Sequence, residues 1–421
     1  MRKLKDSGIE WIGEIPRNKR IIRNKYLLEY TKGKLPVDTN FEGTGFPYIG
    51  ATDLDSHEPC KTYTRDETLP DACDSDLLVL WDGARAGLCG THKVGKVSST
   101  IVRIREVDST IYRPFLYWYY KGFEDYMYQR VNGTTIPHMN RKYIEEIQMI
   151  DWTIQEQCRI VDYLDRKCSQ IDAIIARQQE VIEKLKAYKL SIITEAVTKG
   201  LNPDVPMKDS GVEWIGEIPA HWAIHKFCWD YSAMLGKMLD AKRITGEHLH
   251  PYIKNADVQW DSINFEDLDE MDFSDEEKER YTISPGDLMV CEGGEIGKCA
   301  IVPDDIPEDI YYQKALHRVR KRYSDSGNIY FLSKVIYCMA KNNCLNTSPE
   351  KATIAHLPGD ALSQLRIPSP PISEQDQIAE YLNDKCMEID RLSVCKQETI
   401  DKLIEYKKSL IYEVVTGKKE V

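Results

Sequence analysis

Several features are missing from this 421-residue sequence, and each absence excludes a class of protein. No two of its twelve cysteines have the C-x-x-C spacing of zinc and dithiol redox sites. No uncharged apolar run approaches the roughly eighteen residues that a membrane span needs. The opening residues MRKLKDSG lead into no apolar stretch, so we expect no secretory signal and a reducing, cytoplasmic location. The length favours two or three domains.

The sequence also lacks common enzyme motifs. It has no Walker phosphate loop, dinucleotide-binding glycine motif or nucleophile elbow; GGEIGKC (293–299) is one residue too short for the first. An N-P-P-Y tetrapeptide, which would orient an extruded base for methylation, is missing too. DEEK (275–278) has the acid-x-Lys shape of some nucleases, but it lies in an acidic stretch where chance explains it. The pairs His221/His225 and His248/His250 lack further ligands at metal spacing. We therefore predict neither catalysis nor a metal site.

What the sequence does contain is an internal repeat. KDSGIEWIGEIP (5–16) returns as KDSGVEWIGEIP (208–219) with one difference. Residues 154–200 align without a gap to residues 372–418, and 22 of the 47 positions are identical. A shorter match pairs TTIPHM (134–139) with ATIAHL. Between these anchors the halves differ freely, so each half consists of an opener, a variable globe and a helix.

The last repeated piece predicts a long helix with an apolar seam, because its apolar residues recur at alternating steps of three and four. The seam comprises Leu164, Ile171, Ile175, Ile182, Leu185 and Ile192 in the first copy and Leu382, Ile389, Ile400, Leu403, Leu410 and Val414 in the second. The shared phase favours pairing of the two helices with each other. We expect antiparallel pairing, since each helix passes the chain to a globe at its opposite end. Two helices that pack only on their own globes are the alternative.

The predicted fold class is α+β, with two pseudo-symmetric mixed α/β globes separated by a long antiparallel two-helix coiled coil. Residues 1–152 form the first globe and residues 153–200 the first helical region. Residues 201–371 hold a Gly/Pro-containing linker and the second globe, and residues 372–421 the second helical region. Aromatic residues at helical spacing in both globes indicate core helices. Because the openers repeat, we expect Trp11 and Trp214 to be structural anchors.

The charge is ambiguous about nucleic acid. The formal net charge is −12, whereas DNA-binding domains usually carry a basic footprint. Much of the acidic excess lies in one stretch, residues 257–279. A basic surface on each globe is compatible with this total, so the charge neither supports nor excludes DNA.

The paired motifs resemble one family closely. Two openers K-D-S-G-[IV]-E-W-I-G-E-I-P, each followed by a variable globe, then T-I-x-H, then x-E-Q-x-x-I-x-x-Y-L and a heptad helix, resemble the specificity subunit (HsdS family) of type I restriction-modification systems. The resemblance spans essentially the whole chain. The boundary at 365–382, LRIPSPPISEQDQIAEYL, fits the family pattern, whereas the one at 147–164 lacks the Pro-Pro pair.

The resemblance implies a DNA sequence-recognition role in host defence and DNA methylation. Each globe would be a target recognition domain that reads one half of a bipartite, gapped site in double-stranded DNA. The helices would set the spacing and dock two methyltransferase (M) subunits, and restriction (R) subunits would join the complex. This chain would need no cofactor; S-adenosylmethionine, ATP and Mg would belong to the partner subunits. No membrane partner is implied.

Candidate DNA contacts follow from the chemistry of base and phosphate recognition, which uses Arg, Lys, polar side chains and His. In the first globe they are Lys32, Lys34, Arg85, Lys93, Lys96, Arg130, Thr134, Thr135 and His138. In the second they are Lys237, Lys242, Arg243, Lys298, Lys314, His317, Arg318, Arg320, Arg322, Thr353 and His356. Most of the second set lies in the basic run KALHRVRKR, which could instead be a solvated strand face. His138 and His356 occupy matched positions, which favours a structural role.

Other readings remain open. The chain could be the specificity chain of another restriction-modification type with the same paired design. It could also be a coiled-coil adaptor whose globes bind proteins, which the acidic charge favours. Two dissimilar globes on a duplicated scaffold favour DNA, because an adaptor has no evident need for two different readers. The missing motifs count against a free-standing nuclease or methyltransferase.

Overall fold

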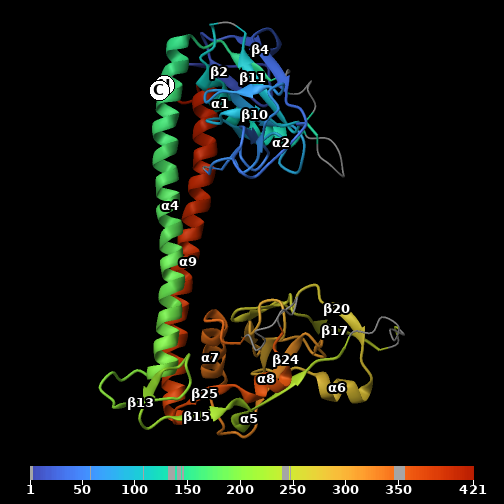
Figure 1. Ribbon diagram of the computed structural model, residues 1–421, viewed down its shortest axis with the longest axis vertical. Coiled ribbons are helices and arrows are strands. Elements are labelled where there is room, and N and C mark those ends of the chain that lie inside the picture. The colour runs from blue at the N-terminus through green and yellow to red at the C-terminus, as the bar shows by residue number, and fades with distance from the viewer. Residues whose placement is uncertain are drawn as a thin grey trace. The chain divides into compact units, whose positions relative to one another are not determined.

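The structure is a computed structural model that describes residues 3–56, 58–107, 109–130, 138–139, 144, 147–238, 246, 248–345 and 356–421. By internal contacts the chain forms two compact units (Figure 1). The first unit combines residues 1–180 with 396–421, and the second comprises residues 181–395. Each unit therefore holds one globe and part of both long helices. Among the described helices, none is long and apolar enough to cross a membrane.

The first unit is built on two four-stranded sheets, ordered β4-β11-β8-β9 and β6-β5-β10-β7. Its elements are β1 (Leu4–Asp6), β2 (Glu14–Pro16), β3 (Ile21–Arg23), η1 (Asn24–Tyr26), β4 (Leu28–Lys32), β5 (Phe46–Ile49), β6 (Tyr63–Thr64), β7 (Asp71–Ala72), β8 (Leu77–Leu80), β9 (Cys89–Gly90), β10 (Gly95–Val97), β11 (Ile101–Glu106), α1 (Arg113–Lys121), α2 (Glu124–Tyr128) and β12 (Gln148–Ile150). Helix α1 lies against β8 and β9.

Strand β8 shows why the sequence has an unbroken apolar run there. Leu77 and Val79 belong to the main core with α1, whereas Leu78 and Leu80 belong to a second core with Ile49 of β5. Successive side chains of a strand point to opposite faces. Because both faces of this strand are covered, all four residues are apolar.

The second unit repeats this plan with its own elements. They are β13 (Met207–Asp209), β14 (Glu217–Pro219), β15 (Ala223–Lys226), α5 (Phe227–Asp230), β16 (Tyr231–Leu235), β17 (Leu249–Ile253), β18 (Val258–Gln259), β19 (Ser262–Ile263), β20 (Asp269–Asp272), α6 (Asp275–Tyr281), β21 (Leu288–Cys291), β22 (Cys299–Ile301), β23 (Tyr311–Tyr312), β24 (Leu316–Lys321), α7 (Ile329–Lys341), α8 (Gly359–Gln364) and β25 (Arg366–Ser369). The sheet β16-β24-β21-β22 corresponds to β4-β11-β8-β9, and α7 corresponds to α1.

The two openers fold alike. β1 pairs with β2 with Lys5 opposite Ile15, and β13 pairs with β14 with Lys208 opposite Ile218. Trp11 packs edge-on against Phe123 with ring centroids 4.5 Å apart. The openers are therefore structural hairpins, as their repetition predicts.

The predicted long helices are α4 (Ile154–Lys199), of 46 residues, and α9 (Ile372–Val415), of 44 residues. The twelve predicted seam positions are all buried or half-buried. In the first unit, Leu164 and Ile171 of α4 share a core with Leu410 and Val414 of α9. In the second unit, Ile193 of α4 shares a core with other α9 residues. Within each unit the start of one helix thus packs with the end of the other.

Repeat-equivalent ion pairs join the two helices in each unit. Lys407 of α9 contacts Asp172 of α4 with 2.6 Å between Nζ and Oδ1. Lys189 of α4 contacts Asp390 of α9 with 2.7 Å between Nζ and Oδ2. Because both residues of one pair align with those of the other, the duplicated helix sequence produces the same contact twice.

Candidate nucleic-acid interface

Five accessible candidate residues, Lys32, Lys34, His138, Lys314 and His356, lie at one end of each larger sheet. We call this the loop end: in the first unit, β4 and β8 end there and β11 begins, since Lys32 is opposite Val102 and Leu80 is opposite Ile101. In the second unit, β16 and β21 end there and β24 begins.

Glycine makes the loop end compact in both globes. A Cβ on Gly33 would lie 2.1 Å from the Ser98 carbonyl oxygen, and one on Gly236 would lie 2.4 Å from the carbonyl oxygen of Gln313. The following residue bridges to the same segment in each case, Lys34 to Ser98 and Lys237 to Gln313. A larger residue at either glycine would clash with the backbone, so the lysine after it has a defined position.

The two T-I-x-H histidines occupy equivalent positions at the loop ends. His138 forms an isolated bridge with Asp82, and His356 forms one with Gly293. Both side chains are exposed. Nδ1 of His138 lies 2.7 Å from the Asp82 carboxylate, whose other oxygen is 3.1 Å from Nζ of Lys32. Asp82 therefore offsets the charge of Lys32 and orients His138.

Two exposed lysines of the loop ends, which we call the uncommitted lysines, have no ion-pair partner among the described residues. Lys34 follows β4 and Lys314 precedes β24, and both are exposed. Neither forms an ion pair with any residue that the structure describes. Among the described residues, the loop end of each globe thus presents an ammonium group without an ion pair, at neighbouring but non-identical positions.

Other first-globe candidates are held within the fold. Lys96 is only 4% exposed; its Nζ lies 2.8 Å from Asp71 and donates to two backbone carbonyls. Arg85 is exposed but pairs with Asp55 at 2.5 Å. Lys93 donates to the Ser56 carbonyl at 2.5 Å, and Arg130 stacks on the Tyr126 ring at 3.6 Å. Burial makes Lys96 a structural cation, which corrects its assignment as a DNA contact.

The basic run of the second globe is also mainly structural, contrary to expectation. His317 is fully buried and contacts the Leu357 carbonyl at 2.8 Å, and burial lowers its pKa. Arg318 is buried, donates to the Thr282 carbonyl, and has its pKa lowered by burial. Arg320 makes two hydrogen bonds to Asp287, and these raise its pKa. His317 and Arg318 are thus buried inside the fold, and Arg320 is half-buried and bound to Asp287.

The remaining candidates divide as follows. Lys298 is buried beside the Gln259 amide, and Lys237 pairs with Glu277 at 2.6 Å. Arg322 is exposed at the opposite end of β24, where it donates to the Tyr231 carbonyl. Lys298 is thereby corrected to a framework residue. Thr134, Thr135, Lys242, Arg243 and Thr353 lie outside the described residues.

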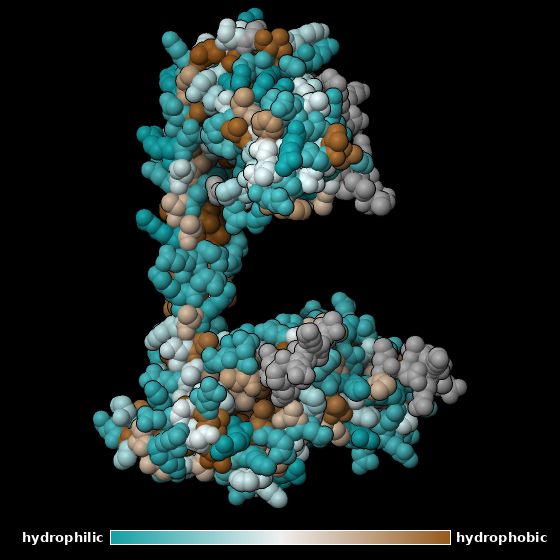
Figure 2. All heavy atoms as spheres, viewed as in Figure 1, coloured by the Kyte–Doolittle hydropathy of each residue, from teal (hydrophilic) through white to brown (hydrophobic). Residues whose placement is uncertain are grey.

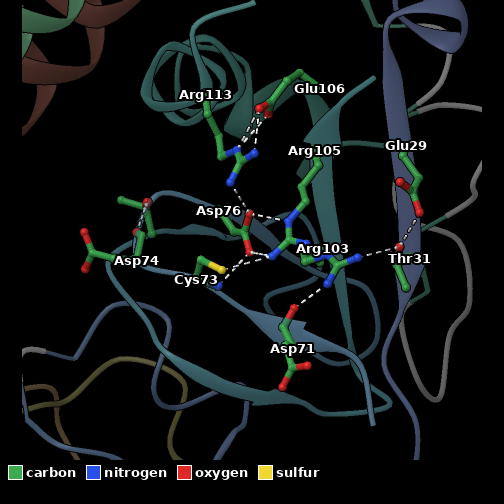
Figure 3. A network of polar contacts seen from close by, with 11 residues as sticks. Glu29, Thr31, Asp71, Cys73, Asp74, Asp76, Arg103, Arg105, Glu106 and Arg113 are labelled. Atoms are coloured by element: carbon green, nitrogen blue, oxygen red, sulfur yellow. Dashed lines mark hydrogen bonds and ion pairs between the residues drawn. The ribbon is translucent and has the colours of Figure 1, made fainter. Parts of the chain in front are cut away.

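Sequence reasoning missed a buried aspartate that supports each large sheet (Figure 3). Asp76 precedes β8 and receives hydrogen bonds from Arg105 at 2.5 and 2.6 Å, while Arg113 lies 3.6 Å away. Asp287 holds the corresponding place before β21 and binds Arg320. The turns match as well, since each carboxylate accepts a backbone N–H three residues earlier, from Cys73 and Ser284. The spacing Asp-(apolar)₄ before a Gly-rich turn is the signal that could have revealed this support.

The E-Q motif at the start of each long helix holds the globe to that helix. Gln157 accepts a hydrogen bond from the Tyr112 N–H at 2.7 Å, next to the start of α1. Gln375 accepts one from the Asn328 N–H at 2.9 Å, next to the start of α7. The preceding glutamates differ in partner: Glu156 binds Lys19, and Glu374 binds the indole N–H of Trp222.

Comparison with known proteins relates this architecture to a family. A family model described as the type I restriction modification DNA specificity domain matches residues 235–391. The type I restriction enzyme MjaVIII specificity subunit of Methanocaldococcus jannaschii is 25% identical over 96% of this chain and 93% of its own length. Residues 235–391 thus match the DNA specificity domain of type I restriction-modification systems, and nearly the whole chain is similar to a specificity subunit.

Solved structures of similar fold cover nearly the whole chain. One, from work on complex assembly and conformational transition of the type I R-M system, superposes with a TM-score of 0.72 at 15% identity, covering 95% of this chain and 98% of the other. The HsdS subunit of Thermoanaerobacter tengcongensis gives a TM-score of 0.50 at 14% identity and covers 96% and 98%. At these identities the likeness is one of fold.

In the part of the chain that the structure describes, no three His, Cys, Asp or Glu residues lie close enough together to hold a metal ion. The thiols of its inner cysteines are buried in apolar surroundings. Burial raises the pKa of Cys168 to about 11 and that of Cys291 to about 12. Such thiols remain protonated and unreactive, so they contribute packing.

Proposed function

We propose that each globe of this specificity subunit reads one half of a bipartite, gapped site in double-stranded DNA, and that the loop ends face the DNA. The observation that carries this proposal is the pair of uncommitted lysines, Lys34 and Lys314, at the same end of two otherwise divergent sheets. Cations without an internal partner suit phosphate contact, which fixes orientation. His138 and His356 lie at the same ends, where polar side chains can reach base edges.

The long helices support a second role, the docking of two copies of one partner. Ile174 and Leu392 are repeat-equivalent exposed apolar residues, and Tyr188 and Tyr406 are another such pair. Each unit carries one aliphatic residue and one tyrosine of these pairs, on helices whose visible surface is otherwise mainly hydrophilic (Figure 2). Exposed apolar groups in repeated positions suit a protein interface. The partner we infer is the methyltransferase subunit.

The helices also suit a spacer. Helix α4 is continuous over 46 residues, which corresponds to about 69 Å at about 1.5 Å per residue. Antiparallel pairing over this length would hold the two globes at a set separation, so the gap between the half-sites would be constant. We infer no catalysis by this chain itself; methyl transfer and any cleavage would belong to the partner subunits, which would bind S-adenosylmethionine, ATP and Mg.

Methylome sequencing tests this function. Cells that carry this chain with its cognate methyltransferase subunit are compared with cells that carry the methyltransferase subunit alone. We expect a new methylated motif of two short words around a fixed gap only when both are present. A folded, co-purifying complex that produces no new motif would instead favour a protein-binding adaptor.

A further inference from the structure

One carboxylate of the second globe contacts the long helices. Asp261 lies at the tip of the β18–β19 hairpin in the left-handed region, at φ 60°. Its Oδ1 lies 2.5 Å from Nζ of Lys334 in α7, and its Oδ2 lies 3.8 Å from Nζ of Lys189 in α4. Lys189 in turn pairs with Asp390 of α9. A chain of four alternating charges thus joins the globe to both helices of the second unit.

The burial of Lys334 makes this row of four charges rigid. Lys334 is 1% exposed, and its ammonium group also lies 4.6 Å from the centre of the Tyr330 ring. A buried ammonium group without a counter-charge is strongly destabilising. Lys334 therefore holds the Asp261 carboxylate in place, and the other oxygen of that carboxylate is presented to Lys189.

The residue before Asp261 seats the hairpin on α7. The indole of Trp260 packs edge-on against Tyr337 with ring centroids 4.8 Å apart, and its N–H donates to Glu295 at 2.7 Å. Lys341 covers the same indole at 4.7 Å. Aromatic and cation–π contacts of this kind restrict the tip to one position.

Among the residues that the structure describes, the matching place in the first unit holds no aspartate between the globe and the helix lysine, Lys407. When the residues before α1 and α7, Tyr112 and Asn328, are aligned, Lys121 corresponds to Tyr337 and Trp118 to Lys334. A pocket of about 540 Å³, lined in part by Lys121, lies there beside the Lys407–Asp172 pair. The side chain of Lys407 is accordingly 26% exposed, against 13% for Lys189.

We propose that Asp261 is a positioning residue that fixes the second globe on the helices through Lys334 and Lys189, and so fixes where the second half-site must lie. In the first globe, the described residues of the corresponding segment after β5 (50–56 and 58–62) form no ion pair with either long helix. The first globe is held on the helices by different contacts, such as the Trp118 indole N–H that donates to Asp165 of α4 at 2.7 Å. A loosened second globe would accept its DNA word at shifted positions. This inference rests on the proposed reading of two half-sites.

The repeat supplies a matched pair of variants for the test. Lys189→Met removes the helix–helix contact and the link to Asp261, whereas Lys407→Met removes the equivalent helix–helix contact alone. Each variant is combined with the methyltransferase subunit, and methylation is measured at sites whose gap is native or one base pair longer or shorter. We expect Lys189→Met to raise relative methylation at altered gaps roughly fivefold, the scale of one lost ion pair. Lys407→Met should leave gap preference as in the parent.

A second variant separates positioning from folding. In Asp261→Asn/Lys334→Met no buried charge is left unpaired, and asparagine accepts the left-handed backbone. We expect this double variant to relax the gap while it still reads the second word, in complexes that co-purify normally with the methyltransferase subunit. Unchanged gap preference in both Lys189→Met and the double variant would overturn the inference. Failure of the parent to yield any two-word motif would overturn the proposed function instead.

Discussion

The two globes keep the same positions but place different chemistry in them. The second residue of β11 in the first globe is Val102, and the second residue of the corresponding strand β24 is His317. Both are buried. Three residues after the opener, Lys19 binds one helix glutamate and Trp222 binds the other. The hydrogen bond to the helix glutamate was thus retained, while the side chain that donates it changed. Divergence reached the interior as well as the surface.

The supporting aspartates, Asp76 and Asp287, also occupy equivalent positions, but they bind different numbers of arginines. Asp76 is fully buried and serves both Arg105 and Arg113, whereas Asp287 binds Arg320, whose side chain is more exposed than that of Arg105. The two arginines nearest these carboxylates, Arg105 and Arg320, both have a raised pKa because of the hydrogen bonds. The first globe therefore depends more heavily on its carboxylate.

The largest effect is expected when the two supporting aspartates are replaced, because this tests directly whether they stabilise their globes unequally. Asp76→Ala should destabilise the first globe by about 3 kcal/mol, because it leaves the part-buried guanidinium group of Arg105 without its carboxylate and removes the second carboxylate near Arg113, which keeps Glu106. Asp287→Ala should destabilise the second globe less, by about 2 kcal/mol. Hydrogen exchange of peptides from β8 and β21 in the full chain measures both. Asp74→Ala, which removes an exposed pair with His92, is the control and should change little. An equal or larger effect of Asp287→Ala would contradict the ranking.

A moderate effect is expected at the loop ends. Lys34→Ala and Lys314→Ala should each weaken DNA binding by about three- to tenfold and lower the salt slope by about one, as loss of one phosphate contact does. The measurement is a titration of the assembled methyltransferase complex with DNA over a range of salt. Lys25→Ala is the matched control, since Lys25 is exposed but precedes β4 at the other end of the strand. If Lys25→Ala has the same effect, the loop end is not the contact surface.

The smallest expected effect is a pH dependence of the stability of the second globe, which has His317 in its core where the first globe has Val102. Burial lowers the pKa of His317, so the folded second globe binds its proton less well than the unfolded chain does. The resulting stability is present above the usual histidine pKa of about 6.5 and is lost as the pH falls below it. We expect the second globe to lose more stability than the first between pH 7 and pH 5, as measured by hydrogen exchange of β24 and β11. His317→Val, which copies Val102, should remove that difference; its persistence would assign the pH dependence elsewhere.

Sequence patterns predicted the elements whose signal is local and repeated. The heptad spacing identified the buried face of both long helices, as Leu164 and Leu382 illustrate, because helical periodicity shows directly which residues share a face. The matched T-I-x-H motifs correctly predicted equivalent positions for His138 and His356. The same repetition correctly predicted that the two openers fold alike, as the matching β1–β2 and β13–β14 hairpins show.

Sequence patterns failed for several basic residues in the strands and the turns next to them. Lys96, Arg318 and Lys298 have the composition of a DNA-binding surface, yet each is buried. Alternation along a strand separates its two faces, but it does not show that both are covered. Here a helix covers one face and a second sheet the other, so cations on β24 must find partners inside the globe.

By itself the sequence determined the duplication, the two openers, the phase of the helix seam and the family, since each is written in repeated residues at constant spacing. Tertiary structure alone decided which cations are free. Asp76, Asp287 and Asp261 are far in sequence from the arginines and lysines that they bind, and only the folded chain brings those charges together. The accessibility of Lys34 and Lys314 is decided in the same way, because a charge is available to a ligand only where the fold supplies it with no partner.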